Sequence, residues 1–305
     1  MSAFAFRQAL DFIKSNRNPD GGWGYWPGRK SLVEPTCYCL LALSAGSDES
    51  LTSKGMGFLR SCQLTSGGMG ISPEDKQGSW MSYAALLAFN AFDADKEKRR
   101  LIDWALRVED ASSRFRPEDI AAIRQLYRYD AAIRGWPWTP ATTAWVESTA
   151  LFVIALIRIG IPPEHERVRS GIGLLLDRRI RSGGWNFGNP FDKSHELEAG
   201  VLSTALALSA LGAAGLPEGH PAMKSGAGFL GRNLEGTIST ASLAWALIAS
   251  MFFPSVSVLA PSVIKKLSGL QTADGGLRNN LFETALASIA LAAPHVVAQT
   301  AGSAR

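Results

Sequence analysis

The strongest constraint on the fold is a short pattern that recurs six times along the chain. It consists of a Thr or Ser, an Ala six residues later and a large apolar residue seven residues later. The segments around these positions are almost entirely apolar over helical lengths, which predicts six buried helices that repeat one structural unit. We call the hydroxyl residues the anchors; they are Thr36, Ser82, Thr149, Thr204, Thr240 and Thr284.

A second repeated element, which contains paired glycines, precedes most anchors. It reads Arg or Gln, two residues, Asp or Ser, Gly-Gly, and then a bulky apolar residue, as in residues 17–23. We call the bulky residues the plugs; they are Trp23, Met69, Trp136, Trp185 and Leu277. The third unit keeps a single Gly135 before its plug, and the fifth, Glu235-Gly236-Thr237, is degenerate. Paired glycines supply the positive φ of a helix end and tight reversal, so we expect these turns and their tryptophans to be structural.

An amphipathic segment with helical spacing lies upstream of each turn. These segments are residues 6–13, 51–59, 101–108, 168–176, 223–230 and 263–270. Each apolar stripe is interrupted by charged residues, which is typical of a helix with one face in water. The pattern therefore predicts two layers, in which six amphipathic outer helices alternate with six buried inner helices.

The two ends of the repeat array favour a closed ring. A solenoid needs terminal repeats with a polar outer face, yet the anchor helices around Thr36 and Thr284 are as apolar as the middle ones. We therefore predict an all-α fold, a single-domain alpha-alpha toroid over residues 1–298 with six inner and six outer helices. Residues 109–134 fall outside the repeat and are predicted to form an extra helix or flap over one end of the ring. Residues 299–305 are predicted to be a disordered tail.

Composition limits the function classes. The chain has 305 residues, of which 46% are hydrophobic and 19% charged, which excludes global disorder. Its net charge of +4 is carried by dispersed cations, which does not favour nucleic-acid binding. No apolar segment reaches the roughly 18 residues of a membrane span, and the N-terminus does not resemble a secretion signal, so we expect a cytoplasmic protein with at most peripheral membrane contact. The spacing of the Cys and His residues suggests no metal site, and no cofactor is expected.

The anchor pattern and the Gly-Gly turn with its plug resemble the repeats of the squalene-hopene cyclase and prenyltransferase alpha-alpha toroids. The resemblance covers about residues 8–292 and implies a terpenoid cyclase-like toroid. Toroids of this kind include triterpene cyclases, the β-subunits of protein prenyltransferases and non-catalytic modules, so the fold does not fix the activity. The zinc site of the prenyltransferases, with its Asp-x-Cys pair, has no match around Cys37, Cys39 or Cys62.

The class II cyclases of that family carry Asp-x-Asp-Asp-Thr-Ala at the start of an inner helix, where the middle Asp protonates the substrate. The matching residues here are 145–150, so the resemblance implies Glu147 as the acid, with Trp145 and Ser148 in place of the flanking acids. Such chemistry needs a carboxyl kept protonated by burial and aromatic faces that stabilise a carbocation. Glu34 holds the same position relative to its anchor and is the weaker candidate.

Several residues at or beside this position of their own repeats are predicted to line the central cavity. They are Trp80, Tyr83, Trp145, Ser148, Phe282 and Glu283. A second interpretation stays open for Glu147, because a Glu in the first turn of a helix also complements the helix dipole. The aromatic residues are equally compatible with core packing.

The sequence leaves three functional hypotheses. The first is acid-initiated cyclisation of a polyprenyl substrate, a hydrophobic isoprenoid, in the central cavity. The second is a non-catalytic toroid that binds an apolar ligand or a partner protein. The third is a polysaccharide-active toroid in which Glu34 and Glu147 act as acid and base. Since triterpene cyclases join two helical barrels and this chain provides one ring, a second chain or domain that completes the site is also considered.

Overall fold

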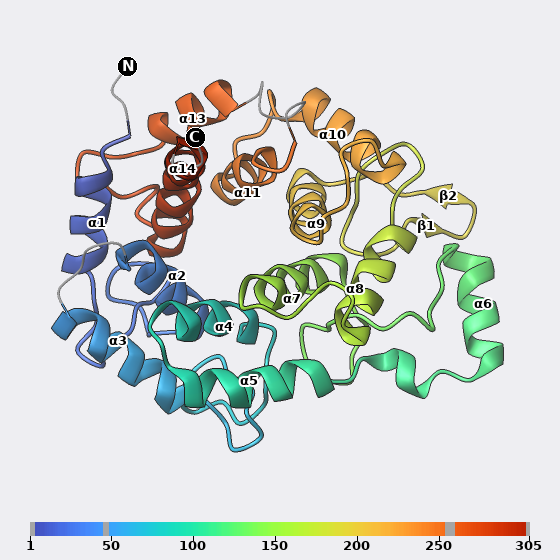
Figure 1. Cartoon of the computed structure of the whole chain (residues 1–305), viewed down its shortest axis with the longest axis horizontal. Helices are drawn as coiled ribbons and strands as arrows, with labels where there is room; N and C mark the ends of the chain where they lie inside the picture. Colours follow the sequence, from blue (N-terminus) through green and yellow to red (C-terminus); the bar gives the residue numbers. More distant parts are fainter. Residues whose placement is uncertain (1–3, 45–48, 254–259, 303–305) are drawn as a thin grey trace.

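The computed structural model describes residues 4–44, 49–253 and 260–302, and its helices form two concentric layers around a common centre (Figure 1). The inner helices are α2 (Val33–Leu43), α4 (Ser82–Ala91), α7 (Val146–Arg158), α9 (Val201–Ala213), α11 (Thr240–Ser250) and α14 (Leu281–Gly302). All six anchors lie in this inner layer and are completely buried. The predicted alpha-alpha toroid is confirmed.

The outer layer consists of the six amphipathic helices that the sequence predicted. They are α1 (Phe6–Ser15), α3 (Glu49–Cys62), α5 (Asp95–Arg107), α8 (Glu166–Asp177), α10 (Pro221–Asn233) and α13 (Ala260–Gly269). In α5, for example, Leu101 and Ala105 are fully buried, whereas the charged residues at its N-terminal end face solvent. The charged face lies outward and the apolar stripe packs on the inner layer.

Residues 109–134 contain the 3-10 helix η1 (Ala111–Arg114) and helix α6 (Pro117–Tyr127). Helix α6 lies at the outer edge of the ring, beside the two-stranded sheet of β1 (Phe191–Asp192) and β2 (His195–Glu196), and not over the central opening (Figure 1). The tail expected to be disordered is described as far as residue 302, where it belongs to α14, and residues 303–305 lie outside the described part.

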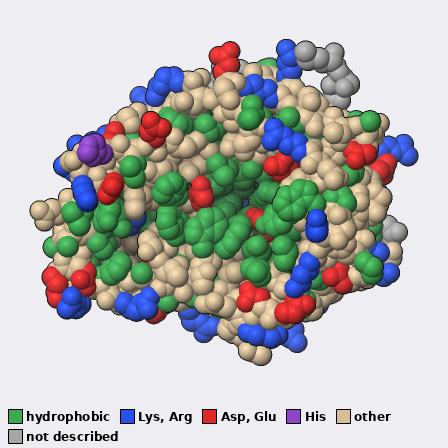
Figure 2. Space-filling model, turned by 180° about the vertical axis from the view of Figure 1, so that it is seen from behind, with side chains coloured by type: hydrophobic (Ala, Val, Ile, Leu, Met, Phe, Trp, Pro, Cys, Tyr) green, Lys and Arg blue, Asp and Glu red, His purple; other side chains and the backbone are tan. Residues whose placement is uncertain are grey.

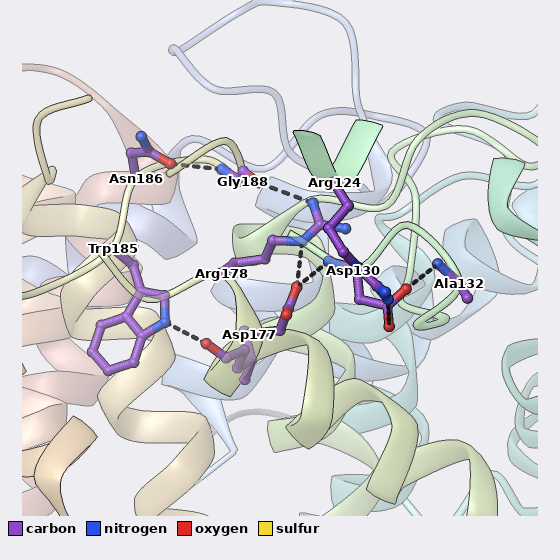
Figure 3. A network of polar contacts seen from close by, with 9 residues as sticks. Arg124, Asp130, Ala132, Asp177, Arg178, Trp185, Asn186 and Gly188 are labelled. Carbon is purple, nitrogen blue, oxygen red and sulfur yellow. Dashed lines mark hydrogen bonds and ion pairs between the residues drawn. The ribbon is translucent and has the colours of Figure 1, made fainter. Parts of the chain in front are cut away.

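A buried arginine attaches this extra segment to the ring (Figure 3). The Arg178 guanidinium donates to the Asp177 carboxylate at 3.3 Å and to the Gly188 carbonyl at 2.9 Å. Asp177 also accepts from the Asp130 N–H at 2.9 Å, and Arg124 of α6 pairs with the Asp130 carboxylate at 2.6 Å. The extra segment is thereby fixed to the end of α8 and to the turn that follows it.

The Gly-Gly turns have the backbone conformation that their sequence predicts. The first glycine of each pair has a positive φ, +99° at Gly67 and +92° at Gly275. A Cβ on Gly67 would lie 2.4 Å from the Arg100 carbonyl oxygen in the next outer helix, and one on Gly275 would lie 2.2 Å from the Gln8 oxygen. Only glycine permits both the conformation and this close packing between successive repeats.

The anchors act as hydrogen-bond acceptors for the plugs. In five repeats the backbone N–H of the plug donates to the hydroxyl of the anchor in the same repeat. These bonds are Trp23 to Thr36 (2.9 Å), Met69 to Ser82 (3.0 Å), Trp136 to Thr149 (2.9 Å), Trp185 to Thr204 (2.9 Å) and Leu277 to Thr284 (2.8 Å). All five plugs are completely buried, so each N–H needs this partner. In the degenerate fifth repeat, by contrast, the Thr240 Oγ1 atom is buried and has no partner among the described residues.

One backbone hydrogen bond joins neighbouring repeats and also closes the ring. A backbone N–H at or just before the start of an inner helix donates to the carbonyl of the residue two positions after the plug of the next repeat. The bonds are Val33 to Ile71, Trp80 to Trp138, Val146 to Phe187 and, from the last repeat back to the first, Leu281 to Tyr25 at 2.8 Å. The Gln271 amide also exchanges two hydrogen bonds with the Ala5 backbone. The sixth repeat therefore meets the first in the same way as each of the first three repeats meets the next.

We predict that Thr204→Val and Thr240→Val differ sharply in stability, although both remove a buried hydroxyl. Thr204→Val leaves the buried Trp185 N–H without an acceptor and should cost about 1–3 kcal/mol of unfolding free energy. Thr240→Val removes an unpartnered hydroxyl and should be neutral or stabilising. Urea unfolding of both variants measures the difference. Equal losses in the two would contradict the role given to the anchors.

Candidate functional site

Glu34 lies in the first turn of α2, and its carboxylate is held by two tyrosines. Its side chain is 5% exposed. One oxygen accepts from the Tyr83 hydroxyl of α4 at 3.0 Å, and the other accepts from Tyr25, two residues after the first plug. The Tyr38 hydroxyl lies 3.0 Å from that of Tyr83. Because the single Tyr83 proton is already donated to Glu34, Tyr38 is the donor in that pair.

Burial raises the pKa of Glu34 from its ordinary value of 4.5 to about 7, although the hydrogen bonds from Tyr25 and Tyr83 favour the charged form and lower it. The pKa values of Tyr25, Tyr38 and Tyr83 are all raised, chiefly because burial disfavours the phenolate, and further by the nearby Glu34. The three phenols therefore stay protonated, and Glu34 is the group in this cluster that exchanges a proton near neutral pH.

Aromatic side chains from four repeats extend the cluster into a continuous surface. We call Trp26, Tyr25, Phe282, Tyr38, Tyr83, Trp80 and Trp138, in this order, the aromatic wall. The centroids of successive rings are 4.5 to 6.4 Å apart. Tyr38 and Tyr83 are buried, whereas Trp80, Trp138 and Phe282 are partly exposed. Aromatic faces therefore extend from the buried carboxyl toward solvent.

The face of the molecule opposite that of Figure 1 is hollowed near its centre, and hydrophobic side chains surround the hollow (Figure 2). A pocket of about 790 Å³ lies beside Glu34, with Tyr25 in its wall. Its other lining residues are Trp26, Pro27, Arg29, Lys30, Leu32 and Asn279. Tyr25 thus separates the Glu34 carboxyl from this pocket.

Glu147, the acid implied by the cyclase motif, has a different environment. It lies in the first turn of α7, is partly exposed, and accepts from the Ser203 hydroxyl of the neighbouring helix α9 at 2.8 Å. Trp145 is partly exposed and packs on Phe187 with the ring centroids 5.8 Å apart. Ser148 is buried and donates to the Trp136 carbonyl.

The other residues predicted to line the cavity divide into two groups. Trp80, Tyr83 and Phe282 all belong to the aromatic wall. Glu283 is partly exposed, but its Oε2 atom is buried and has no hydrogen-bond partner in the described part of the chain. Glu34 is thus brought together with three of the predicted residues.

Two members of the site, Tyr25 and Trp138, were not predicted from the sequence. Both lie two positions after a plug, where the backbone carbonyl accepts from an N–H at or just before the start of the preceding inner helix. An alignment of the repeats shows this fixed position, so it could have been used to predict Tyr25 and Trp138 as site residues. Tyr38 was also missed, although it lies one helical turn after Glu34 on the same face of α2.

Asp110 is the other buried acid among the described residues, and its role is structural. Its 1% exposed carboxylate accepts from the Gly135 N–H at 2.6 Å and from the Ser112 N–H at 2.9 Å. It therefore caps η1 and fixes the backbone of the turn that precedes the plug of the third repeat. The described residues contain no group of three or more His, Cys, Asp or Glu side chains placed to hold a metal ion.

No protein-family model matches the sequence, and no curated protein matches it. The fold, however, matches solved structures over nearly its whole length. The type II terpene cyclase MstE from Scytonema has a TM-score of 0.64 at 17% identity, with 95% of this chain and 97% of that chain covered. A protein from Actinoplanes has a TM-score of 0.65 at 19% identity, with 94% and 97% covered. An alpha-amylase from Clostridium perfringens has a TM-score of 0.64 at 12% identity, with 93% and 96% covered. Identities this low establish the terpenoid cyclase-like toroid fold alone.

Within the described part of the chain, none of the helices combines the length and the apolar character needed to cross a membrane.

We predict that Glu34→Gln changes how stability depends on pH. A carboxyl whose pKa rises from 4.5 to about 7 on folding stabilises the fold fully below pH 4.5, and this contribution is lost as the pH rises through about 7. The loss amounts to about 3 kcal/mol. Relative to Glu34→Gln, wild-type unfolding free energy should therefore decrease between about pH 5 and about pH 8 in urea titrations. Parallel pH profiles for the two proteins would show that Glu34 titrates normally in the folded state.

Proposed function

We propose that this chain is a terpene cyclase-like enzyme of the acid-initiated, class II type. In this proposal Glu34 protonates the terminal alkene of a polyprenyl substrate that occupies the central hollow. One observation carries it: Glu34 is a buried carboxyl with a pKa of about 7, hydrogen-bonded to Tyr25 and Tyr83 of the aromatic wall. Glu147, which matches the family acid by sequence, is partly exposed and bonded to Ser203, so the proposal assigns the proton to Glu34.

Tyr25 and Tyr83 suit Glu34 to proton donation, because they can hydrogen-bond both its protonated and its charged carboxyl. A protonated carboxyl keeps an acceptor position on each oxygen, so Tyr25 and Tyr83 remain bonded while the O–H points at the substrate. After proton transfer the same two hydroxyls stabilise the carboxylate. Burial thus keeps the Glu34 carboxyl protonated near neutral pH, and the hydrogen bonds from the two tyrosines make its proton easier to give up.

The reaction follows from that proton transfer. The O–H bond of Glu34 breaks, the π electrons of the terminal alkene form a C–H bond, and the more substituted carbon becomes a tertiary carbocation. Internal alkenes then attack in turn, each forming a C–C bond and moving the positive charge, until the last cation releases a proton to water. The Glu34 carboxylate then recovers a proton from water. The sum is a redox-neutral isomerisation. Ring faces in the aromatic wall would stabilise the travelling charge by about 0.5–2 kcal/mol each.

The substrate class is a hydrophobic isoprenoid. The aromatic wall, which includes the partly exposed rings of Trp80, Trp138 and Phe282, offers apolar contact along the length of such a chain. Scytonema MstE, similar in fold, has been solved with geranylgeranyl dihydroxybenzoate as its substrate. That compound is therefore the first one to test here.

We predict that Glu34→Gln lowers turnover of a geranylgeranyl substrate at least about 100-fold, because the near-isosteric amide cannot donate the proton. The matched control is Glu147→Gln, which makes the same change at the same position of another repeat and should keep activity within about 3-fold of wild type. Product formation by mass spectrometry, with geranylgeranyl dihydroxybenzoate and geranylgeraniol, measures both. A loss in Glu147→Gln with activity retained in Glu34→Gln would place the acid at Glu147 instead.

The pH profile gives a second readout on the same residue. The wild-type rate should fall as the pH rises through about 7, because the protonated fraction of Glu34 falls there. Tyr83→Phe removes a donor that favours the carboxylate, so it should raise the pKa of Glu34 and move this fall to higher pH. A shift to lower pH would contradict the assignment.

A further inference from the structure

The seam between the fifth and sixth repeats is built differently from the other seams. Elsewhere the plug is completely buried between its own inner helix and the next outer helix. Each of the three tryptophan plugs packs against a glycine of that outer helix. The pairs are Trp23 with Gly55, Trp136 with Gly171 and Trp185 with Gly226, and a Cβ on the glycine would lie 2.6 to 3.1 Å from the ring. A large plug therefore requires that no side chain stands at that point of the outer helix.

The fifth repeat has no such plug. Ile238, which follows the degenerate Gly236-Thr237 pair, is 74% exposed. In α3 and α8 the glycine that receives the plug lies eight residues before the Gln or Arg of the following turn, and the same position in α13 is the buried Val263. The anchor Thr240 has an unpartnered buried hydroxyl, because no plug N–H reaches it. Within the residues that the structure describes, this seam therefore lacks the buried plug and the plug-to-anchor hydrogen bond of the other repeats.

A pocket of about 660 Å³ lies at this seam, which we call the seam pocket. Its apolar walls are Ile238 and Leu243 from the fifth repeat and Leu270 from the sixth. Leu243 follows Thr240 by three residues, so both lie on the same side of α11. Burying these apolar walls under a ligand would be favourable, as burying the plugs is elsewhere.

The polar lining of the seam pocket is mainly cationic. It contains Lys265, Lys266 and Arg278, against one acid, Glu235. The Lys266 ammonium is occupied, since it donates to the carbonyls of Leu234 at 2.9 Å and Thr237 at 3.4 Å and so holds the degenerate turn in place. Lys265 is exposed and forms no ion pair with the residues that the structure describes. Arg278 donates one N–H to the Ile238 carbonyl at 2.8 Å, and its remaining donors are available.

We propose that the seam pocket binds a small organic anion with an apolar body, such as a medium-chain carboxylate. The body packs on Ile238, Leu243 and Leu270, and the anionic end pairs with Lys265 and Arg278. The fork of the Arg278 guanidinium suits a carboxylate in particular. This site is separate from the aromatic wall, and the inference does not rest on the function proposed for Glu34.

The test uses the full chain with two probes, the fluorescent aromatic sulfonate 1-anilinonaphthalene-8-sulfonate and decanoate. We expect the sulfonate to bind with enhanced fluorescence and decanoate to displace it. Lys265→Glu combined with Arg278→Glu should weaken decanoate binding at least about 10-fold. The matched control is Lys96→Glu combined with Arg99→Glu, which makes the same change of charge on the exposed face of α5 and should bind as wild type.

A second variant tests the pocket without altering charge. Ser262 lines the seam pocket and is exposed, so Ser262→Trp should fill the pocket and abolish displacement by decanoate while the circular dichroism melting curve stays close to wild type. Decanoate binding that is equal in wild type, the charge variant and the filled variant would overturn the proposal. Binding to anionic phosphatidylglycerol vesicles without binding of free decanoate would also overturn it.

Discussion

The hydrogen bond from the plug N–H to the anchor hydroxyl is the interaction on which the rest of the structure depends. The plug is buried, so its N–H must find an acceptor inside the protein. The turn that carries it leaves the regular helix, and the anchor supplies the missing acceptor from the adjoining inner helix. This bond fixes the rotation of five of the six inner helices relative to their turns, and in the described part of the chain α11 is the one without it. It therefore also determines which side chains of the first helical turn face the centre of the ring.

The site is a consequence of that fixed register. Residues two positions before an anchor, Glu34 and Glu147, begin the inner helices, and residues two positions after a plug, Tyr25 and Trp138, form the connections between repeats. Repetition of one frame thus brings side chains from the first, second, third and sixth repeats together. Ring closure through Leu281 and Tyr25 makes the last repeat a neighbour of the first, which is why Phe282 packs on Tyr25 and Tyr38.

The sequence was sufficient to predict the helices, the two layers and the closed ring, because these follow from periodicity and from turn chemistry within each repeat. It favoured Glu147 over Glu34, because the segment around Glu147 matches the family motif, although both occupy the same position in the frame. Their environments differ through contacts between repeats: Tyr83 and Tyr25 surround Glu34, whereas Glu147 meets Ser203. The position of α6 at the outer edge was likewise not predictable, because it depends on Arg178 and Asp177 in a distant helix.

The central claim is that Glu34 is a buried acid that carries a proton at neutral pH, and infrared spectroscopy tests it most directly. The C=O stretch of a protonated carboxyl is measured as a wild-type minus Glu34→Gln difference across a pH titration. The account predicts a carboxylic acid band that loses half its intensity near pH 7. A band that is already lost near 4.5, the ordinary pKa of a glutamate, would contradict it.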